Sequence, residues 1–199
     1  SIAPGEIYGL VGESGSGKTT LALAVVRYLA RNGGIKGGSV LLDGVDLLSL
    51  SRPEMRRVWG SRITMVHQDP GRSVNPSIPV GEQIAEMARV HLGMTKAEAR
   101  RKSVEMLTRV RMPDPATVAR RYAHQLSGGQ LQRILIAIAL TTNPRLLIMD
   151  EPTTALDVTT EAVILDLVRD LLSEYQTAVL YITHNLGVVA QIADRVAVM

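Results

Sequence analysis

The sequence contains no cysteine, so it can form neither a disulfide framework nor a thiolate metal site. It also has no long apolar run, because the longest, residues 134–140, falls far short of the ~18 apolar residues that a membrane-crossing helix needs. No succession of basic, apolar and small residues opens the chain, as it would in a signal peptide. These absences favour a soluble protein of a reducing compartment, and the cytoplasm is the default expectation.

A large charge of one sign is missing as well, because the net charge is only +3 over 199 residues. This excess is too small to indicate nucleic-acid binding. The basic residues of one region have two interpretations: a solvated helix face, or a surface that meets a partner or an anionic membrane leaflet. The first is simpler, since a charge run does not identify its counterpart. These residues are Arg100, Arg101, Lys102, Arg109, Arg111, Arg120 and Arg121.

Hydrophobic residues make up 46% of the chain, which is enough for one well-buried domain. Short apolar runs alternate with segments of helical spacing. This alternation predicts a parallel sheet covered by helices on both faces, in which ligands bind beyond the carboxyl ends of the strands. The expected strands are residues 6–11, 63–66, 146–149 and 178–183, with a further one from 195, and the expected helices are residues 18–30, 127–140, 159–172 and 186–193.

Two segments interrupt the alternation. Asp43-Gly44 lies between two short apolar stretches and predicts a β-hairpin. Residues 80 to about 122 follow a helical pattern, in which Thr95 and Glu98 have the spacing of a capping box. We therefore expect a helical insert within the sheet core.

Residues 12–19 match the phosphate-loop pattern G-x-x-x-x-G-K-[ST] at every fixed position, between an expected strand and an expected helix. In such a loop the glycines let backbone N–H groups point into one concavity, Lys18 reaches the β- and γ-phosphates, and Thr19 offers a hydroxyl to Mg²⁺. A flexible turn is the alternative, but it gives no reason for the Lys-Thr pair. The candidate phosphate-binding residues are Gly12, Glu13, Ser14, Gly15, Ser16, Gly17, Lys18, Thr19 and Thr20.

Two carboxylates, Asp150 and Glu151, follow the apolar run at residues 146–149. In a parallel sheet this places both at the edge where the phosphate loop lies. Asp150 would then hold the Mg²⁺ shell, and Glu151 would orient or deprotonate the attacking water. Taken alone, the pair is more typical of a turn or a helix start, and the phosphate loop upstream reverses that judgement.

The segment Leu126-Ser127-Gly128-Gly129-Gln130 opens an expected helix. Ser127 and Gln130 have capping-box spacing, which explains part of the motif. The two glycines remain unexplained, since each costs up to ~1 kcal/mol relative to alanine in a helix. Close approach of a ligand to the backbone is the better reason, and it makes this helix N-terminus a second anion site.

The phosphate loop, the Asp150-Glu151 pair and the LSGGQ segment, in this order, resemble an ABC ATPase over essentially all 199 residues. The resemblance implies a P-loop NTPase fold: a mostly parallel sheet core flanked by helices, with an inserted helical subdomain. It divides the single domain into a core of residues 1–79 and 143–199 and a helical subdomain of about 80–142. We expect the chain to be truncated at both ends, so that the family's adenine-stacking aromatic lies upstream of it.

The resemblance also implies roles for individual residues. In that family two domains pack head to tail, so the LSGGQ segment would contact the γ-phosphate of ATP held by the opposite domain. Gln68 would sense Mg²⁺ and water, and His184 would contact the γ-phosphate from its own side. The implied catalytic residues are Glu151, His184 and Gln68; the implied ligands of Mg²⁺ are Thr19, Gln68 and Asp150; and the residues acting in trans are Ser127, Gly128, Gly129, Gln130 and Asp157, the last at the dimer seam.

Four stretches narrow the resemblance to the ATPases of oligopeptide, dipeptide and nickel importers. They are residues 68–76, 80–84, 152–159 and 182–189. The sequence departs from that group at His67, where Phe is usual, at Ala123, where Pro is common, at Leu131, where a polar residue is common, and at Asn185, where Asp is usual. None of these departures removes a catalytic group.

The resemblance therefore implies an ATPase that energises an importer for oligopeptides, dipeptides or nickel from the cytoplasmic face of the membrane. Its cofactors would be ATP and Mg²⁺. Its partners would be a second ABC ATPase domain, integral membrane permease subunits and, indirectly, a substrate-binding protein, without nucleic acid. Alternatives are a non-transport ABC ATPase, such as an accessory ATPase of a phosphonate-degrading complex, and a P-loop kinase or GTPase, for which no acceptor site or guanine-reading motif is visible.

Overall fold

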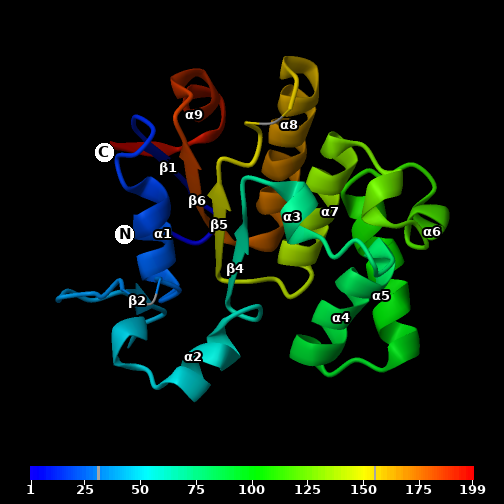
Figure 1. The fold of residues 1–199 in the computed structure, drawn as a ribbon, viewed down its shortest axis with the longest axis horizontal. Helices are drawn as coiled ribbons and strands as arrows, with labels where there is room; N and C mark the ends of the chain where they lie inside the picture. The colour runs from blue at the N-terminus through cyan, green and yellow to red at the C-terminus, as the bar shows by residue number, and fades with distance from the viewer. Residues whose placement is uncertain (31, 155) are drawn as a thin grey trace.

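A five-stranded sheet forms the centre of the molecule in the computed structural model, which describes residues 1–30, 32–154 and 156–199 (Figure 1). Its strand order is β4-β5-β6-β1-β7, and every neighbouring pair is parallel. The strands are β1 (Ile7–Val11), β4 (Ile63–Val66), β5 (Leu146–Asp150), β6 (Ala178–Thr183) and β7 (Arg195–Val198). The expected parallel sheet is thus confirmed.

Helices pack on both faces of this sheet and in a separate group beside it. They are α1 (Lys18–Val25), α2 (Arg52–Val58), α3 (Pro70–Ser73), α4 (Val80–Leu92), α5 (Lys96–Arg109), α6 (Pro115–Val118), α7 (Gly128–Leu140), α8 (Val158–Tyr175) and α9 (Leu186–Ile192), with 3-10 turns η1 (Leu47–Ser49) and η2 (Ala123–Gln125). In Figure 1, α4, α5 and α6 form a group to one side of the strands, and α7 lies between this group and the sheet. No helix in the described part of the chain is both long and apolar enough for a bilayer crossing.

The two faces of the sheet bury separate apolar clusters, because side chains alternate along a strand. On β6, Val179 and Tyr181 join the cluster packed under α7 and α8. Leu180 and Ile182 join the other cluster, with residues of α1 and α2. Burial on both faces explains why β5 and β6 are almost continuously apolar, the property from which a parallel sheet was predicted.

The helix after the phosphate loop is shorter than the expected range, residues 18–30. It ends in a Schellman motif, in which the Tyr28 amide donates to the Leu23 carbonyl and the Arg27 amide donates to Ala24. Arg27 takes the left-handed conformation, with φ of 54°, that glycine usually supplies. Because no glycine or asparagine occupies this position, the end of the helix could not be predicted.

The expected hairpin is confirmed, with short strands β2 (Leu41–Leu42) and β3 (Val45–Asp46). Both turn residues, Asp43 and Gly44, have positive φ, as the favoured two-residue hairpin turn requires. Asp46 then caps η1 by accepting from the Leu48 amide, and this ends the strand.

The capping box expected within the helical segment is also confirmed. Thr95 and Glu98 form the capping box of α5, with the Glu98 carboxylate accepting from the Thr95 amide at 2.8 Å. Helix α2 was missed, although Ser51 and Glu54 form a capping box of the same kind. Its run of charged residues masked the periodicity, because only Met55 and Val58 are buried.

Candidate functional site

The phosphate loop joins β1 to α1, as its sequence context predicts (Figure 1). Two of its glycines, Gly15 and Gly17, have φ of 85° and 102°, which a residue with a side chain rarely adopts. Gly17 caps α1, so the first amides of that helix face the loop. Backbone donors and a helix N-terminus are therefore available to an anion.

Lys18 is the only residue of the loop that is buried, with 5% of its surface exposed. Its ammonium group donates to the carbonyl oxygens of Gly12 and Glu13, at 2.8 and 2.7 Å, and to Ser16 Oγ at 3.4 Å. The loop thus wraps around its own cation. A phosphate oxygen is a stronger, charged acceptor and can replace one of these carbonyls.

Thr19 lies beside Asp150, although 131 residues separate them in sequence. The Thr19 hydroxyl donates to Asp150 Oδ1 at 3.1 Å. Burial raises the pKa of Asp150 above its ordinary value of 3.8, although the hydrogen bond from Thr19 acts in the opposite direction. A buried carboxylate next to a hydroxyl offers the oxygen donors that Mg²⁺ prefers, so these residues fit the expected cation.

Glu151 receives donors from two other segments. His184 Nδ1 lies 3.2 Å from Glu151 Oε1, and Gln68 Nε2 donates to Glu151 Oε2 at 3.3 Å. Gln68 follows β4 and His184 follows β6, while Glu151 follows β5. The predicted catalytic residues are therefore brought together at the carboxyl edge of three adjacent strands.

A third donor to Glu151 is Thr154, whose hydroxyl donates to Oε2 at 3.1 Å. Sequence reasoning missed this residue, because only its position three residues after Glu151 could have indicated it. The turn between Glu151 and Thr154 is anchored to β6 through Thr153. Thr153 and Tyr181 are both buried, and their hydroxyl oxygens lie 3.5 Å apart. Burial also raises the pKa of Tyr181, so its phenol stays neutral and can donate.

The LSGGQ residues lie elsewhere, in a second pocket with no lining residue from the phosphate loop. Ser127 caps α7 by accepting from the Gln130 amide, and the Gln130 side chain returns the bond, so the expected capping box is confirmed. The pocket is lined by Pro113, Ser127, Gly128, Gly129, Gln130, Arg133, Leu156, Asp157 and Thr160. Arg133 was not predicted, and its guanidinium donates to the Arg111 carbonyl.

The structure distinguishes the two glycines of this pocket by the space around each. A Cβ on Gly129 would lie 2.6 Å from Thr160 Cγ2, which is too close for any real contact. Packing against α8 therefore explains Gly129 without a ligand, contrary to the sequence interpretation. A Cβ on Gly128 would meet only Leu156, at an ordinary 3.7 Å, so packing does not explain this glycine and close approach of a ligand stays a prediction there.

Asp157 begins α8 and accepts from the amide and the hydroxyl of Thr160, at 3.0 and 2.7 Å. These hydrogen bonds lower the pKa of Asp157. The preceding Ala155, part of the motif that carried the resemblance, lies outside the described residues. Thr20, also expected at the phosphates, is exposed on the first turn of α1.

The residues that depart from the importer pattern have local roles. Asn185 caps α9 by accepting from the Gly187 amide at 2.9 Å. Ala123 is buried, and Leu131 packs against the main core. His67 lines an apolar groove.

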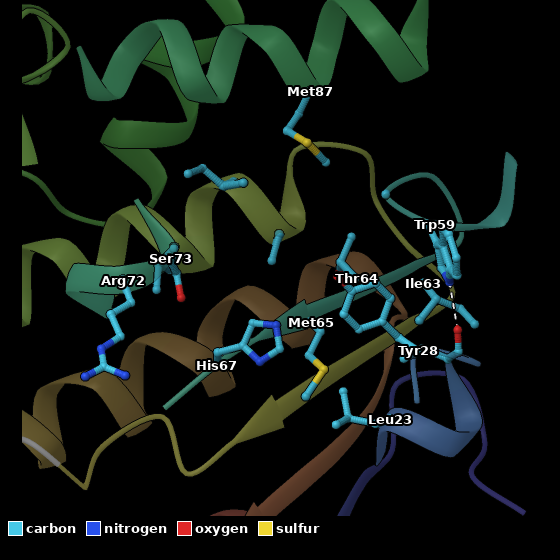
Figure 2. Close-up of a pocket in the computed structure, with 15 residues that line it drawn as sticks. Leu23, Tyr28, Trp59, Ile63, Thr64, Met65, His67, Arg72, Ser73 and Met87 are labelled. Atoms are coloured by element: carbon cyan, nitrogen blue, oxygen red, sulfur yellow. Dashed lines mark hydrogen bonds between the residues drawn. The ribbon is translucent and has the colours of Figure 1, made fainter. Parts of the chain in front are cut away.

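This groove, of about 520 Å³, lies between β4, α7 and α4 (Figure 2). Figure 2 shows Tyr28 and Trp59 at one end and His67 and Arg72 at the other, with Met87 above. The Trp59 indole donates to the Val26 carbonyl at 2.8 Å and is thereby held in place. His67 and Arg72 flank Gln68 in sequence, so the groove adjoins the loop that reaches Glu151.

A glycine-rich loop at a helix N-terminus, with two carboxylates at the carboxyl end of another parallel strand of the same sheet, defines a P-loop nucleotide-binding domain. The ABC transporter family model matches residues 1–154 of the sequence. The chain therefore belongs to the ABC transporter family, as the motifs predicted, and this membership implies ATP binding.

Relatives agree with the narrower resemblance to peptide importers. One, from Brucella melitensis biotype 1, is named as a candidate peptide import ATP-binding protein and is 52% identical over 204 residues. Another of the same name, from Brucella abortus, is 47% identical over 199 residues. Each alignment covers 100% of this chain and 60% of the relative, so the chain spans about three fifths of their length.

Solved structures confirm the fold. A dimeric ATP-binding cassette in a post-hydrolysis state, bound to ADP and Pi, matches with a TM-score of 0.85 and 28% identity, covering 100% of this chain and 83% of that one. A part of the ABC transporter complex cbiONQ from Clostridium perfringens matches with a TM-score of 0.84 and 28% identity, covering 100% and 75%.

Proposed function

We propose that this chain is the ATP-hydrolysing cassette of an ABC importer for oligopeptides, dipeptides or nickel. The observation that carries the proposal is the meeting of Gln68 and His184 on the Glu151 carboxylate, beside the Thr19-Asp150 pair. A structural ion pair would need one partner, whereas hydrolysis needs a base, a cation site and a phosphate contact at one place. The names of the relatives favour peptides as the cargo.

The chemistry follows from these positions. The amides of residues 12–19 and the Lys18 ammonium hold the β- and γ-phosphates. Glu151 orients a water molecule for attack on the γ-phosphorus and takes up its proton, while the bond to the bridging oxygen breaks and ADP leaves. Thr19, Asp150 and Gln68 would hold Mg²⁺, which neutralises charge on the phosphate oxygens. His184 contacts the γ-phosphate from the end of β6.

A second cassette would complete each site. Ser127 and Gly128 lie at the N-terminus of α7, in a pocket separate from the phosphate loop of the same chain. Head-to-tail pairing brings this helix end to the γ-phosphate held by the partner, with Asp157 at the seam. ATP then links the two cassettes, and hydrolysis releases them.

The membrane subunits would sense this cycle through the loop that carries Gln68. Met65 and Ile138 both line the apolar groove next to this loop, and nothing in the described chain fills it. We assign the groove to a helix from the cytoplasmic face of a permease subunit, because a helix face supplies matching apolar side chains. A change at Gln68 would then move both the groove and the Glu151 carboxylate.

The test uses the full-length protein with two variants. Glu151→Gln is expected to bind ATP and pair with a second cassette while hydrolysis collapses. Gly128→Asp is expected to bind ATP normally yet lose turnover, because it places a charge at the trans phosphate site. Normal turnover in Glu151→Gln would overturn the assigned base.

Mixing experiments test the shared site directly. Neither Gly128→Asp nor Lys18→Ala is expected to be active alone. A mixture of the two can form dimers with one intact composite site, and random pairing restores up to about a quarter of the wild-type sites. A mixture as inactive as its components, although mixed dimers are detected, would argue against the head-to-tail arrangement. An accessory ATPase of a phosphonate-degrading complex would instead co-purify without integral membrane subunits.

A further inference from the structure

Glu151 occupies an unusual backbone conformation. Its φ of 47° lies in the left-handed region, which is sterically unfavourable for a residue with a side chain. Its amide donates to the Ile182 carbonyl at 2.9 Å, so the strained residue is tied to β6. Such strain persists only where neighbouring contacts fix it, and it turns the side chain off the line of β5 toward the loops.

Three donors fix the Glu151 carboxylate, but two of them have other tasks. In the proposed function Gln68 turns to Mg²⁺ and His184 turns to the γ-phosphate, so both contacts change during the cycle. Thr154 has no such task. Its hydroxyl contacts Oε2 at 3.1 Å from within the same turn, three residues along the chain.

We propose that Thr154 is a positioning residue for hydrolysis: it holds Oε2 of Glu151 so that Oε1 faces the attacking water throughout the cycle. The inference rests on the proposed role of Glu151 as the base. Thr154 takes no part in the phosphate contacts or the cation site of the proposed function.

The turn is built so that this hydroxyl stays in place. The Thr154 amide donates to the Glu151 carbonyl at 3.4 Å, and the Leu156 amide donates to the Thr153 carbonyl at 3.0 Å. Thr153 is buried beneath, in contact with the Tyr181 hydroxyl. Threonine also has a restricted χ1, so its hydroxyl loses little freedom on bonding to the carboxylate. A water molecule in place of the Thr154 hydroxyl would first have to be immobilised.

The experiment measures ATP hydrolysis by the full-length protein with its partner subunits. Thr154→Val keeps the shape and removes the donor, and it is expected to lower kcat about 3- to 10-fold with KM unchanged within about 2-fold. Thr154→Ser keeps the donor and is expected to retain kcat within about 2-fold. Thr108→Val, on the exposed side of α5, is the matched control for the substitution itself.

The outcomes separate the possible failures. A fall in kcat that serine rescues, with unchanged KM and unfolding midpoint, supports the inference, because a merely structural threonine would lower stability instead. Wild-type kcat in Thr154→Val overturns it. Glu151→Gln is measured in parallel: if that variant keeps full turnover, the proposed function fails, whereas if it is inactive while Thr154→Val is normal, only the role of Thr154 fails.

Discussion

Substitution of Gly129 by alanine tests whether the LSGGQ helix and α8 are packed as tightly as the structure indicates. The added Cβ would lie 2.6 Å from Thr160 Cγ2. This methyl cannot swing away cheaply, because threonine is stiff at χ1 and its hydroxyl bonds to Asp157 Oδ2 at 2.7 Å. One of the two helices must therefore shift.

The magnitude follows from two opposing effects. Overpacking of this kind costs about 1–3 kcal/mol. Alanine in place of glycine in a helix returns up to about 1 kcal/mol. With the full return, the net expectation for Gly129→Ala is a loss of up to about 2 kcal/mol, or up to roughly 8 °C in Tm for a domain of this size. Gly128→Ala is the matched control and is expected to be neutral or slightly stabilising, since its Cβ meets only Leu156 at 3.7 Å.

The assay is urea unfolding of both variants, followed by a double-mutant cycle with Thr160→Ser. Serine keeps the hydroxyl bonded to Asp157 and removes the obstructing methyl. The double variant is expected to recover most of the loss, with a coupling energy of about 1 kcal/mol or more. Equal stability of Gly129→Ala and Gly128→Ala, or a serine change that gives no recovery, would refute the packing argument.

Three further predictions concern other parts of the molecule. Lys18→Ala removes the buried cation of the phosphate loop and should weaken ATP binding about 10- to 100-fold in a fluorescence titration, because charged hydrogen bonds to phosphate are lost. Hydrogen bonds from Thr95 lower the pKa of Glu98 below its ordinary value of 4.5. The ionised Glu98 carboxylate therefore stabilises the folded protein above pH 4.5, and this stabilisation is lost as the pH falls through the lowered pKa. Urea unfolding of Glu98→Gln should lack this acid-side loss. Met87→Asp, in the groove, should reduce co-purification with membrane subunits, whereas Val90→Asp, on the exposed face of α4, should not.

The sheet and the position of Asp150 and Glu151 at its edge were predictable because each has a local signature. The near-continuous apolar runs of β5 and β6 are required by burial on both faces, and a carboxylate after such a run must lie at the sheet edge. The partners of Glu151 were not predictable from periodicity or spacing. Gln68 and His184 lie in loops without a pattern of their own, and only the resemblance to a family singled them out.

Misses arose where tertiary contacts decide the local structure. Arg27 adopts the left-handed conformation at the end of α1, although arginine is not a residue type that predicts a turn. Helix α2 has only two buried side chains. At Gly129 the cost of a glycine in a helix is likewise explained by a tertiary contact. A costly glycine in a helix indicates close approach of something, but the sequence cannot say whether that is a ligand or a neighbouring helix of the same chain.

The segment from Glu151 to Asp157 connects the two half-sites within one chain. At its start Thr154 and Thr153 tie Glu151 to the turn and to β6. At its end Asp157 caps α8 through Thr160, and the same Thr160 packs against Gly129 of the LSGGQ helix. Because Gly129 leaves no slack at this contact, a displacement of α7 by a partner's nucleotide must move α8 and its first residue as well. We therefore expect the proposed base of one site to respond to occupancy of the other, and Thr160→Ser, which removes the methyl group from this contact, should weaken this response even at temperatures where the variant is fully folded.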